Sequence, residues 1–284
     1  MPEFLAIHQS DAALLGCVLR AGASKLTLGE GETAAGVGFF QSDDVLLRKR
    51  PLPARVSLPG SLATALAEGV ESEAVLVCAG FLQGPLHGPQ TRGFQEEATL
   101  PLRFKRWLFA LAGKPDGLLP ARPVLLAALP EHLRRNARGD TAGEVLFLHF
   151  LARLRDLGRL DDPDLDAPTA AKALAAAVGE AERALESLGV LHPPLAVVAS
   201  NGRVLVALRR GHGLSLARIE GLATCPKHEV GPGMKELNPL RRSHAGLQAR
   251  LLLSGDPAVP VDGYTPLPEG GIVAVGRDLS VSQF

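Results

Sequence analysis

The pattern of hydrophobic and polar positions changes twice along this chain of 284 residues. In the first 110 residues, short apolar runs of strand length are separated by turn residues. These predicted strands are Glu3 to His8, Gly36 to Phe40, Val45 to Arg50, Ala74 to Phe81 and Arg106 to Leu111. The N-terminal part therefore predicts a layered sheet. Between Gln83 and Ala98 the apolar period disappears, and Gly, Pro, Gln and Glu indicate a long surface loop.

Helical spacing replaces the strand pattern in the middle of the chain. It predicts helices over Arg122 to Asn136, Ala142 to Asp156 and the alanine-rich stretch from Pro168 to Leu188. For the last of these, Thr169 is the expected N-cap, without the acidic partner of a full capping box because Lys172 lies three residues later.

Strands return after Pro193 and Pro194. The runs Leu195 to Ala199 and Arg203 to Leu208 flank Asn201-Gly202, a dipeptide that favours a tight hairpin. Length alone would allow two domains. Strands, then helices, then strands are typical of an α+β layered domain, so we expect a single domain over residues 1–284.

Composition and charge narrow the range of partners. The chain is 46% hydrophobic, and thirty Lys and Arg balance thirty Asp and Glu. A neutral chain has no overall field that would recruit nucleic acid or an anionic membrane. We therefore expect a protein partner, of unknown identity, or a small-molecule ligand, also unknown.

Sequence signals for secretion and membrane insertion are weak. The first seven residues lack a basic segment and a long apolar run, and no stretch approaches the roughly 20 apolar residues of a membrane span. Three cysteines, Cys17, Cys78 and Cys225, show no disulfide rhythm, as is usual in a reducing compartment. The expected location is the cytoplasm, without membrane insertion.

Two groups of residues raise the question of a metal. Cys225 and His228 have ligand-like spacing, and His244 could supply a third ligand, but a zinc site would need Cys17 or Cys78 to arrive through the fold. We interpret this segment as a structural turn and expect no metal and no cofactor. An acidic run lacks the central Gly and final Glu of a calcium loop and predicts a solvated loop; it comprises Asp161, Asp162, Asp164 and Asp166.

Several segments, spread over most of residues 1–284, form a pattern through their order and spacing. They are Gly36 to Phe40 with Val45 to Pro51, Arg106 to Gly113, Leu133 to Phe147, the hairpin at Asn201-Gly202 and the closing run from Ile272 to Leu279. Together these segments resemble class II glutamine amidotransferases, which have an N-terminal nucleophile. The resemblance implies an α+β fold of the N-terminal-nucleophile type, a four-layer αββα sandwich of two antiparallel sheets between helical layers.

The same resemblance shows which catalytic groups are missing. The family's nucleophilic cysteine would fall on Pro2, which offers neither thiol nor hydroxyl beside the free amine. The family's His-Asn-Gly turn corresponds to Leu111, Ala112 and Gly113, so only the glycine N–H of the oxyanion site is kept.

The substrate-binding groups of the family are also replaced. Its arginine for the glutamine carboxylate aligns with Gly80, and its aspartate for the glutamine amine aligns with Ala142. Each replacement is small or apolar. We therefore expect no catalytic residue at these positions and no glutaminase activity.

Two classes of function are compatible with such a chain. The favoured one is a catalytically inactive amidotransferase-like protein that acts as a binding, scaffold or regulatory subunit. The alternative is an enzyme of changed chemistry, a hydrolase or amidotransferase-like protein, that uses a site without cysteine such as the secondary amine of Pro2. A filled family pocket would favour the first class, and an open polar cavity would favour the second.

Overall fold

A computed structural model describes residues 3–23, 34–42, 44–51, 62–80, 82, 96–255 and 261–284. Strands within them form two antiparallel sheets. The first sheet has the order β11 (Thr265–Pro266), β9 (Gly213–Glu220), β10 (Gln248–Gly255), β1 (Glu3–Gln9), β4 (Ala74–Ala79), β2 (Ala34–Gln41) and β3 (Asp44–Pro51). The second has the order β13 (Val281–Gln283), β12 (Ile272–Val275), β8 (Leu205–Arg210), β7 (Leu195–Ser200), β6 (Trp107–Gly113) and β5 (Leu102–Phe104).

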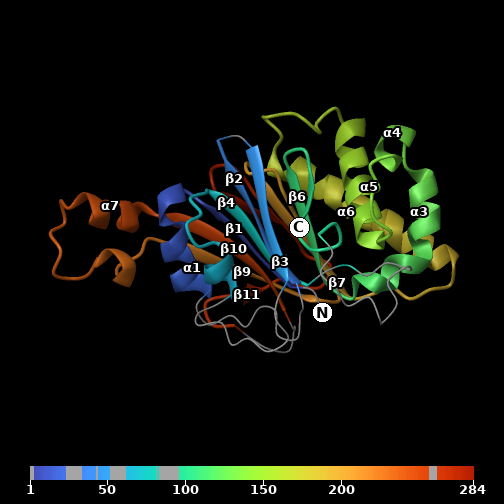
Figure 1. The fold of residues 1–284 in the computed structure, drawn as a ribbon. Helices are drawn as coiled ribbons and strands as arrows, with labels where there is room; N and C mark the ends of the chain where they lie inside the picture. Colours follow the sequence, from blue (N-terminus) through green and yellow to red (C-terminus); the bar gives the residue numbers. More distant parts are fainter. Residues whose placement is uncertain are drawn as a thin grey trace.

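The helices lie on the outer faces of these sheets (Figure 1). α1 (Leu15–Ala23) and α2 (Leu62–Leu66) accompany the first sheet, and α3 (Arg122–Ala128), α5 (Ala142–Asp156) and α6 (Ala167–Ser187) accompany the second. Two short helices, α4 (Glu131–Arg134) and α7 (Pro239–Gly246), complete the set among the described residues. The predicted αββα sandwich is confirmed.

Strand alternation explains why both faces of the first sheet are buried. On β1, Phe4 and Ala6 belong to the core between the sheets, whereas Leu5 and Ile7 pack in the separate cluster that contains α1. Successive side chains of a strand point to opposite faces. A strand that is apolar at successive positions can therefore contribute side chains to a hydrophobic core on each face of the sheet.

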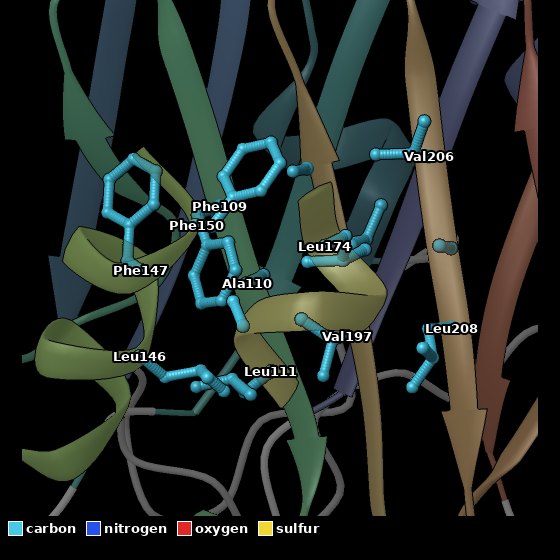
Figure 2. Close-up of a cluster of buried hydrophobic side chains, with 14 of the residues drawn as sticks. Phe109, Ala110, Leu111, Leu146, Phe147, Phe150, Leu174, Val197, Val206 and Leu208 are labelled. Carbon is cyan, nitrogen blue, oxygen red and sulfur yellow. The ribbon is translucent and has the colours of Figure 1, made fainter. Parts of the chain in front are cut away.

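Aromatic residues of β6 pack against α5, while α6 lies against β8 and β12 of the same sheet. Trp107 meets Phe150 of α5 edge to face, with ring centroids 4.9 Å apart, and Phe109 stacks on Phe147 at 4.8 Å. Figure 2 shows the rings of Phe109, Phe147 and Phe150 near Leu174 of α6 and aliphatic side chains of β7 and β8. The odd-numbered positions of β6 thus face the helices.

Most predicted elements are confirmed, and the differences have local causes. The helix expected over residues 122–136 is divided into α3 and α4, with Leu129 extended and Pro130 at the start of the second helix. The strand expected to reach Phe81 ends at Ala79; Phe81 lies outside the described residues. At the β7–β8 hairpin, Asn201 accepts hydrogen bonds from two backbone N–H groups and Gly202 has a φ of 84°.

The expected cap of α6 is wrong by three residues. Asp166 is the N-cap, and its carboxylate accepts hydrogen bonds of 2.8 Å from both the backbone N–H and the hydroxyl of Thr169. Thr169 is therefore the donor at the third helical position, while Pro168 occupies the first turn, where it needs no N–H partner.

This cap gives a first prediction. Asp166→Ala should lower the free energy of unfolding by about 1 kcal/mol, because one N-terminal N–H loses its acceptor. The measurement is urea unfolding followed by circular dichroism. Asp164→Ala is the matched control and should change stability by less than about 0.5 kcal/mol; equal effects of both changes would contradict the assigned cap.

A buried histidine makes stability depend on pH. His8 of β1 is 2% exposed, and its Nδ1 has no hydrogen-bond partner among the described residues. Burial lowers the pKa of His8 to about 4, below the value of about 6.5 expected in the unfolded chain. Between these values the unfolded chain binds the proton more readily, so stability is complete above pH 6.5 and falls as the pH drops towards 4.

The expected loss attributable to His8 is at most about 3 kcal/mol between pH 7 and pH 4. His8→Phe should flatten this part of the curve of unfolding free energy against pH, whereas His192→Gln, at a more exposed position, should leave it unchanged. Identical slopes for the wild type and His8→Phe would refute the assignment.

Candidate functional site

The end of β6 meets the first turn of α5 at one of the positions implied by the resemblance. Leu111 is fully buried, and a Cβ placed on Gly143 would lie 2.5 Å from Leu111 Cδ1 and 2.7 Å from Leu82 Cδ1. These two leucines therefore lie directly against the helix backbone. The side chains occupy the space beside Ala142, which is 1% exposed.

The next two residues of β6 are also packed. Ala112 is fully buried and belongs to the core that contains both sheets and helices. Gly113 has a φ of 91°, and a Cβ there would lie 2.3 Å from the carbonyl oxygen of Pro194. Backbone packing alone requires glycine at this position.

Gly80 follows β4 and is held by backbone contacts. Its N–H donates to the carbonyl of Ala34 at 2.8 Å, and its carbonyl accepts from Leu100 N–H at 3.4 Å. Its φ of 100° favours glycine. Pro2, the remaining predicted position, lies outside the described residues.

The segment before α5 supports the helix start. Thr141 caps the helix by accepting from Glu144 N–H, and the Glu144 carboxylate accepts from the N–H groups of Arg138 and Gly139 at 2.8 Å each. This reciprocal arrangement fixes the loop before the helix. The stretch that resembles the family's arginine- and glutamate-containing motif thus has a structural explanation in these contacts.

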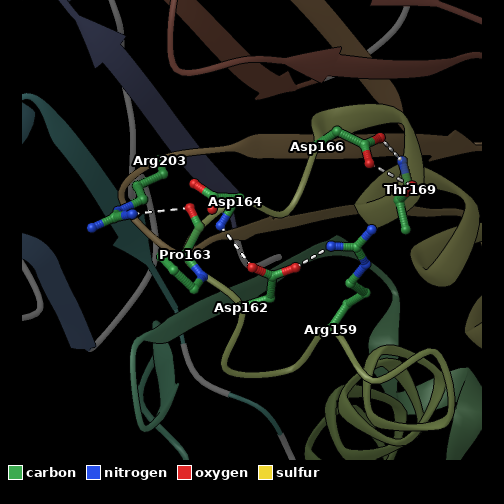
Figure 3. A network of polar contacts seen from close by, with 7 residues as sticks. All are labelled: Arg159, Asp162, Pro163, Asp164, Asp166, Thr169 and Arg203. Carbon is green, nitrogen blue, oxygen red and sulfur yellow. Dashed lines mark hydrogen bonds and ion pairs between the residues drawn. The ribbon is translucent and has the colours of Figure 1, made fainter.

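The acidic run forms a closed loop between α5 and α6, as Figure 3 shows. Asp162 pairs with Arg159 and accepts from Asp164 N–H, while the Pro163 carbonyl accepts from Arg203. The Arg159 guanidinium beside Asp162 helps lower the pKa of that half-buried carboxyl. These contacts agree with the predicted solvated loop.

A second group of chemically active side chains lies at the other end of the molecule. Cys17 of α1, Cys225, His228 and His244 of α7 each offer one sulfur or nitrogen atom, and all four atoms lie within 4.8 Å of one another. Cys78 is fully buried on β4 in a different core cluster. The fold thus joins Cys17 to the three residues with ligand-like spacing.

Sequence reasoning found Cys225, His228 and His244 and left the choice of a fourth residue open. Cys17 is separated from Cys225 by 208 residues. Its place on the inner side of α1 depends on how this helix packs on the sheet. The available signal was the amphipathic run from Leu15 to Leu19, which puts Cys17 among buried positions.

Comparison with solved structures identifies the same architecture. The chain superposes on a glutamine aminotransferase class-II domain protein from Silicibacter pomeroyi with a TM-score of 0.56 and 18% identity, over 99% of this chain and 98% of the other. It also resembles the structure of an allosteric regulatory enzyme of purine biosynthesis, with a TM-score of 0.52 and 13% identity, over 99% of this chain and 48% of that one. At these identities the likeness establishes the fold.

Other comparisons add no family assignment. No protein-family model matches the chain, and no curated protein matches it either. Across the described ranges, every helix is too short or too polar to span a bilayer.

The packing around Leu111 gives a prediction. Leu111→Ala should lower the free energy of unfolding by about 2–5 kcal/mol, because it opens a cavity against α5. The measurement is the denaturant midpoint with an unchanged slope. Leu191→Ala, at a side chain that is 90% exposed, is the matched control and should cost less than about 0.5 kcal/mol. A loss below about 1 kcal/mol at Leu111 would mean that this side chain borders open space.

Proposed function

We propose that this chain is a class II amidotransferase-fold protein that works by binding a protein partner and does not hydrolyse glutamine. The packing of Leu111 and Leu82 against Gly143 carries the proposal. This packing puts apolar side chains against the first turn of α5, next to Ala142. The resemblance implies a substrate-binding group at that position. A site for glutamine needs convergent polar groups to hold a zwitterion.

Ala112, Gly80 and Gly113 also support the proposal that the chain does not hydrolyse glutamine. Ala112 has no side-chain donor for an oxyanion, and losing one such donor typically costs about 10²–10³ in rate. Gly80 and Gly113 have backbone geometries that explain their presence without catalysis. The fold is then retained for its surface and stability.

The enzymatic alternative depends on Pro2, which lies outside the described residues. The sequence identifies no acid or electrophile that would act with the secondary amine of this residue. Binding is therefore the function that the geometry supports best, as a scaffold or regulatory subunit.

The first test is ammonia release from glutamine by purified full-length protein, with an active class II amidotransferase assayed in parallel. We expect release no greater than from a heat-denatured sample, since the chain has no thiol at residue 2. Glutamine at millimolar concentration should also leave the thermal midpoint unchanged, because a ligand that does not bind cannot stabilise.

Ammonia release that copurifies with the chain and disappears in Pro2→Ala would overturn the proposal in favour of the enzymatic alternative. Gly113 is a poor choice for this control, because its left-handed backbone would make any substitution structural.

The second test concerns the partner. Tagged protein is isolated from its native cells at near-endogenous level, and companions present in near-equal amounts are identified by mass spectrometry. The companion is then purified and mixed with the chain, and the proposal predicts a complex of defined stoichiometry by light scattering. A chain isolated without any companion in near-equal amount, or a companion that forms no complex with the purified chain, would contradict a scaffold function.

A further inference from the structure

The segment between β9 and β10, residues 221–247, forms a lobe that projects beside α1 (Figure 1). Backbone hydrogen bonds close its base, where Gly221 N–H donates to Leu247 and Leu222 N–H donates to His244. Only four of its side chains are buried, namely Cys225, Val230, His244 and Leu247. Two buried aliphatic side chains, with Leu222 and Met234 partly buried against the same core, are few for a lobe of this size. Small units of this kind usually need a covalent or metal staple.

The cluster of Cys17, Cys225, His228 and His244 lies where this lobe meets the body. Each ligand atom comes from a different local structure. Cys17 is on α1, Cys225 is in a two-residue bridge to Val230, His228 ends the 3₁₀ turn Pro226–His228, and His244 is on α7. Three of the four residues are at most 3% exposed, and His228 is half-buried.

Four of the six distances between the ligand atoms are within about 0.5 Å of the edges of a zinc tetrahedron, and the other two are no longer than 4.8 Å. Zn–S bonds of about 2.3 Å and Zn–N bonds of about 2.0–2.1 Å give tetrahedral edges of about 3.8 Å between sulfurs, 3.5 Å between sulfur and nitrogen and 3.3 Å between nitrogens. The Cys17 and Cys225 sulfurs are 3.3 Å apart, and His228 Nδ1 is 3.3 Å and 3.8 Å from them. His228 Nδ1 and His244 Nε2 are 3.2 Å apart.

The orientation of His244 matches metal binding. Its Nδ1 lies 2.7 Å from the Leu240 carbonyl, which can only accept a hydrogen bond. Nδ1 therefore carries the proton, and the lone pair of Nε2 faces the other three groups. A backbone carbonyl that fixes the tautomer in this way is a usual partner of a metal-bound histidine.

We propose that Cys17, Cys225, His228 and His244 bind one Zn²⁺ ion as a closed structural site that fastens the lobe to α1. A set of two thiolates and two neutral imidazoles favours zinc, in tetrahedral coordination, among the common divalent ions. Two thiolates also balance the charge of the ion. Four protein ligands leave no open position for substrate, so the site stabilises and does not catalyse.

A Cys17–Cys225 disulfide is the competing explanation. A disulfide needs a sulfur–sulfur distance near 2.05 Å, and at 3.3 Å the two thiols are free. A disulfide would also leave the convergence of two imidazole nitrogens on the same point unexplained.

The test measures metal in the full-length chain, purified without a histidine tag or chelator from cells grown with zinc. Elemental analysis and native mass spectrometry should give about one zinc per chain, and X-ray absorption should give two sulfur and two nitrogen neighbours at about 2.3 Å and 2.0 Å. Cys225→Ser should reduce the zinc content at least about fivefold. Cys78→Ala, which changes a buried cysteine outside the cluster, should retain it.

A second readout does not depend on how well a variant folds. A strong chelator added to the wild-type protein should speed tryptic cleavage in the lobe, after Lys227, Lys235, Arg241 or Arg242, by at least about tenfold. Cleavage elsewhere should change little, and added zinc should restore protection.

Three results would overturn the inference. One is a folded wild-type chain that contains no zinc and binds none at micromolar concentration. Another is a freshly prepared chain whose intact mass and peptide map show a Cys17–Cys225 disulfide. The third is equal zinc content in Cys225→Ser and in the wild type. None of these outcomes bears on glutamine hydrolysis, so this inference and the proposed function are tested separately.

Discussion

Close packing of the two sheets is the constraint on which the rest of this structure depends. A Cβ on Gly36 would lie 2.3 Å from the Leu100 carbonyl, and one on Gly38 would lie 2.7 Å from Leu108 of the opposite sheet. Small residues on facing strands let the two sheets approach each other closely. The larger side chains interdigitate around them at the packing density usual for protein interiors. Substitutions in this layer have little room to relax, which explains its glycine- and alanine-rich strands.

Close packing also accounts for the residues at the end of β6, where the resemblance implies an active site. Ala112 lies on the buried strand β6, and Leu111, on its opposite face, fills the gap beside Gly143 and Leu82. A polar side chain at either position would need a buried hydrogen-bond partner or would cost free energy. Packing at this end of β6 is thus sufficient to explain why these two residues are apolar.

Much of this architecture could be predicted from local patterns. The strands around Leu5, Leu46, Leu76 and Phe109 and helices α5 and α6 follow from apolar runs and helical periodicity. β9 and β10 were missed, because Gly213–Glu220 and Gln248–Gly255 mix charged residues into the strands. The cap of α6 was misplaced because Ser, Thr and Asp all serve as caps, and only the backbone geometry distinguishes Asp166 from Thr169.

The thiol and imidazole cluster shows why the rest could not be read from sequence. Spacing along the chain identifies ligands that share a turn, such as Cys225 and His228, but Cys17 joins them only because α1 packs on the outer face of the first sheet. That packing in turn depends on Leu5 and Ile7 pointing away from the inter-sheet core. The geometry of the cluster is therefore a consequence of the sandwich. The lobe contributes little apolar surface of its own, so its position relies on contacts that the sandwich supplies.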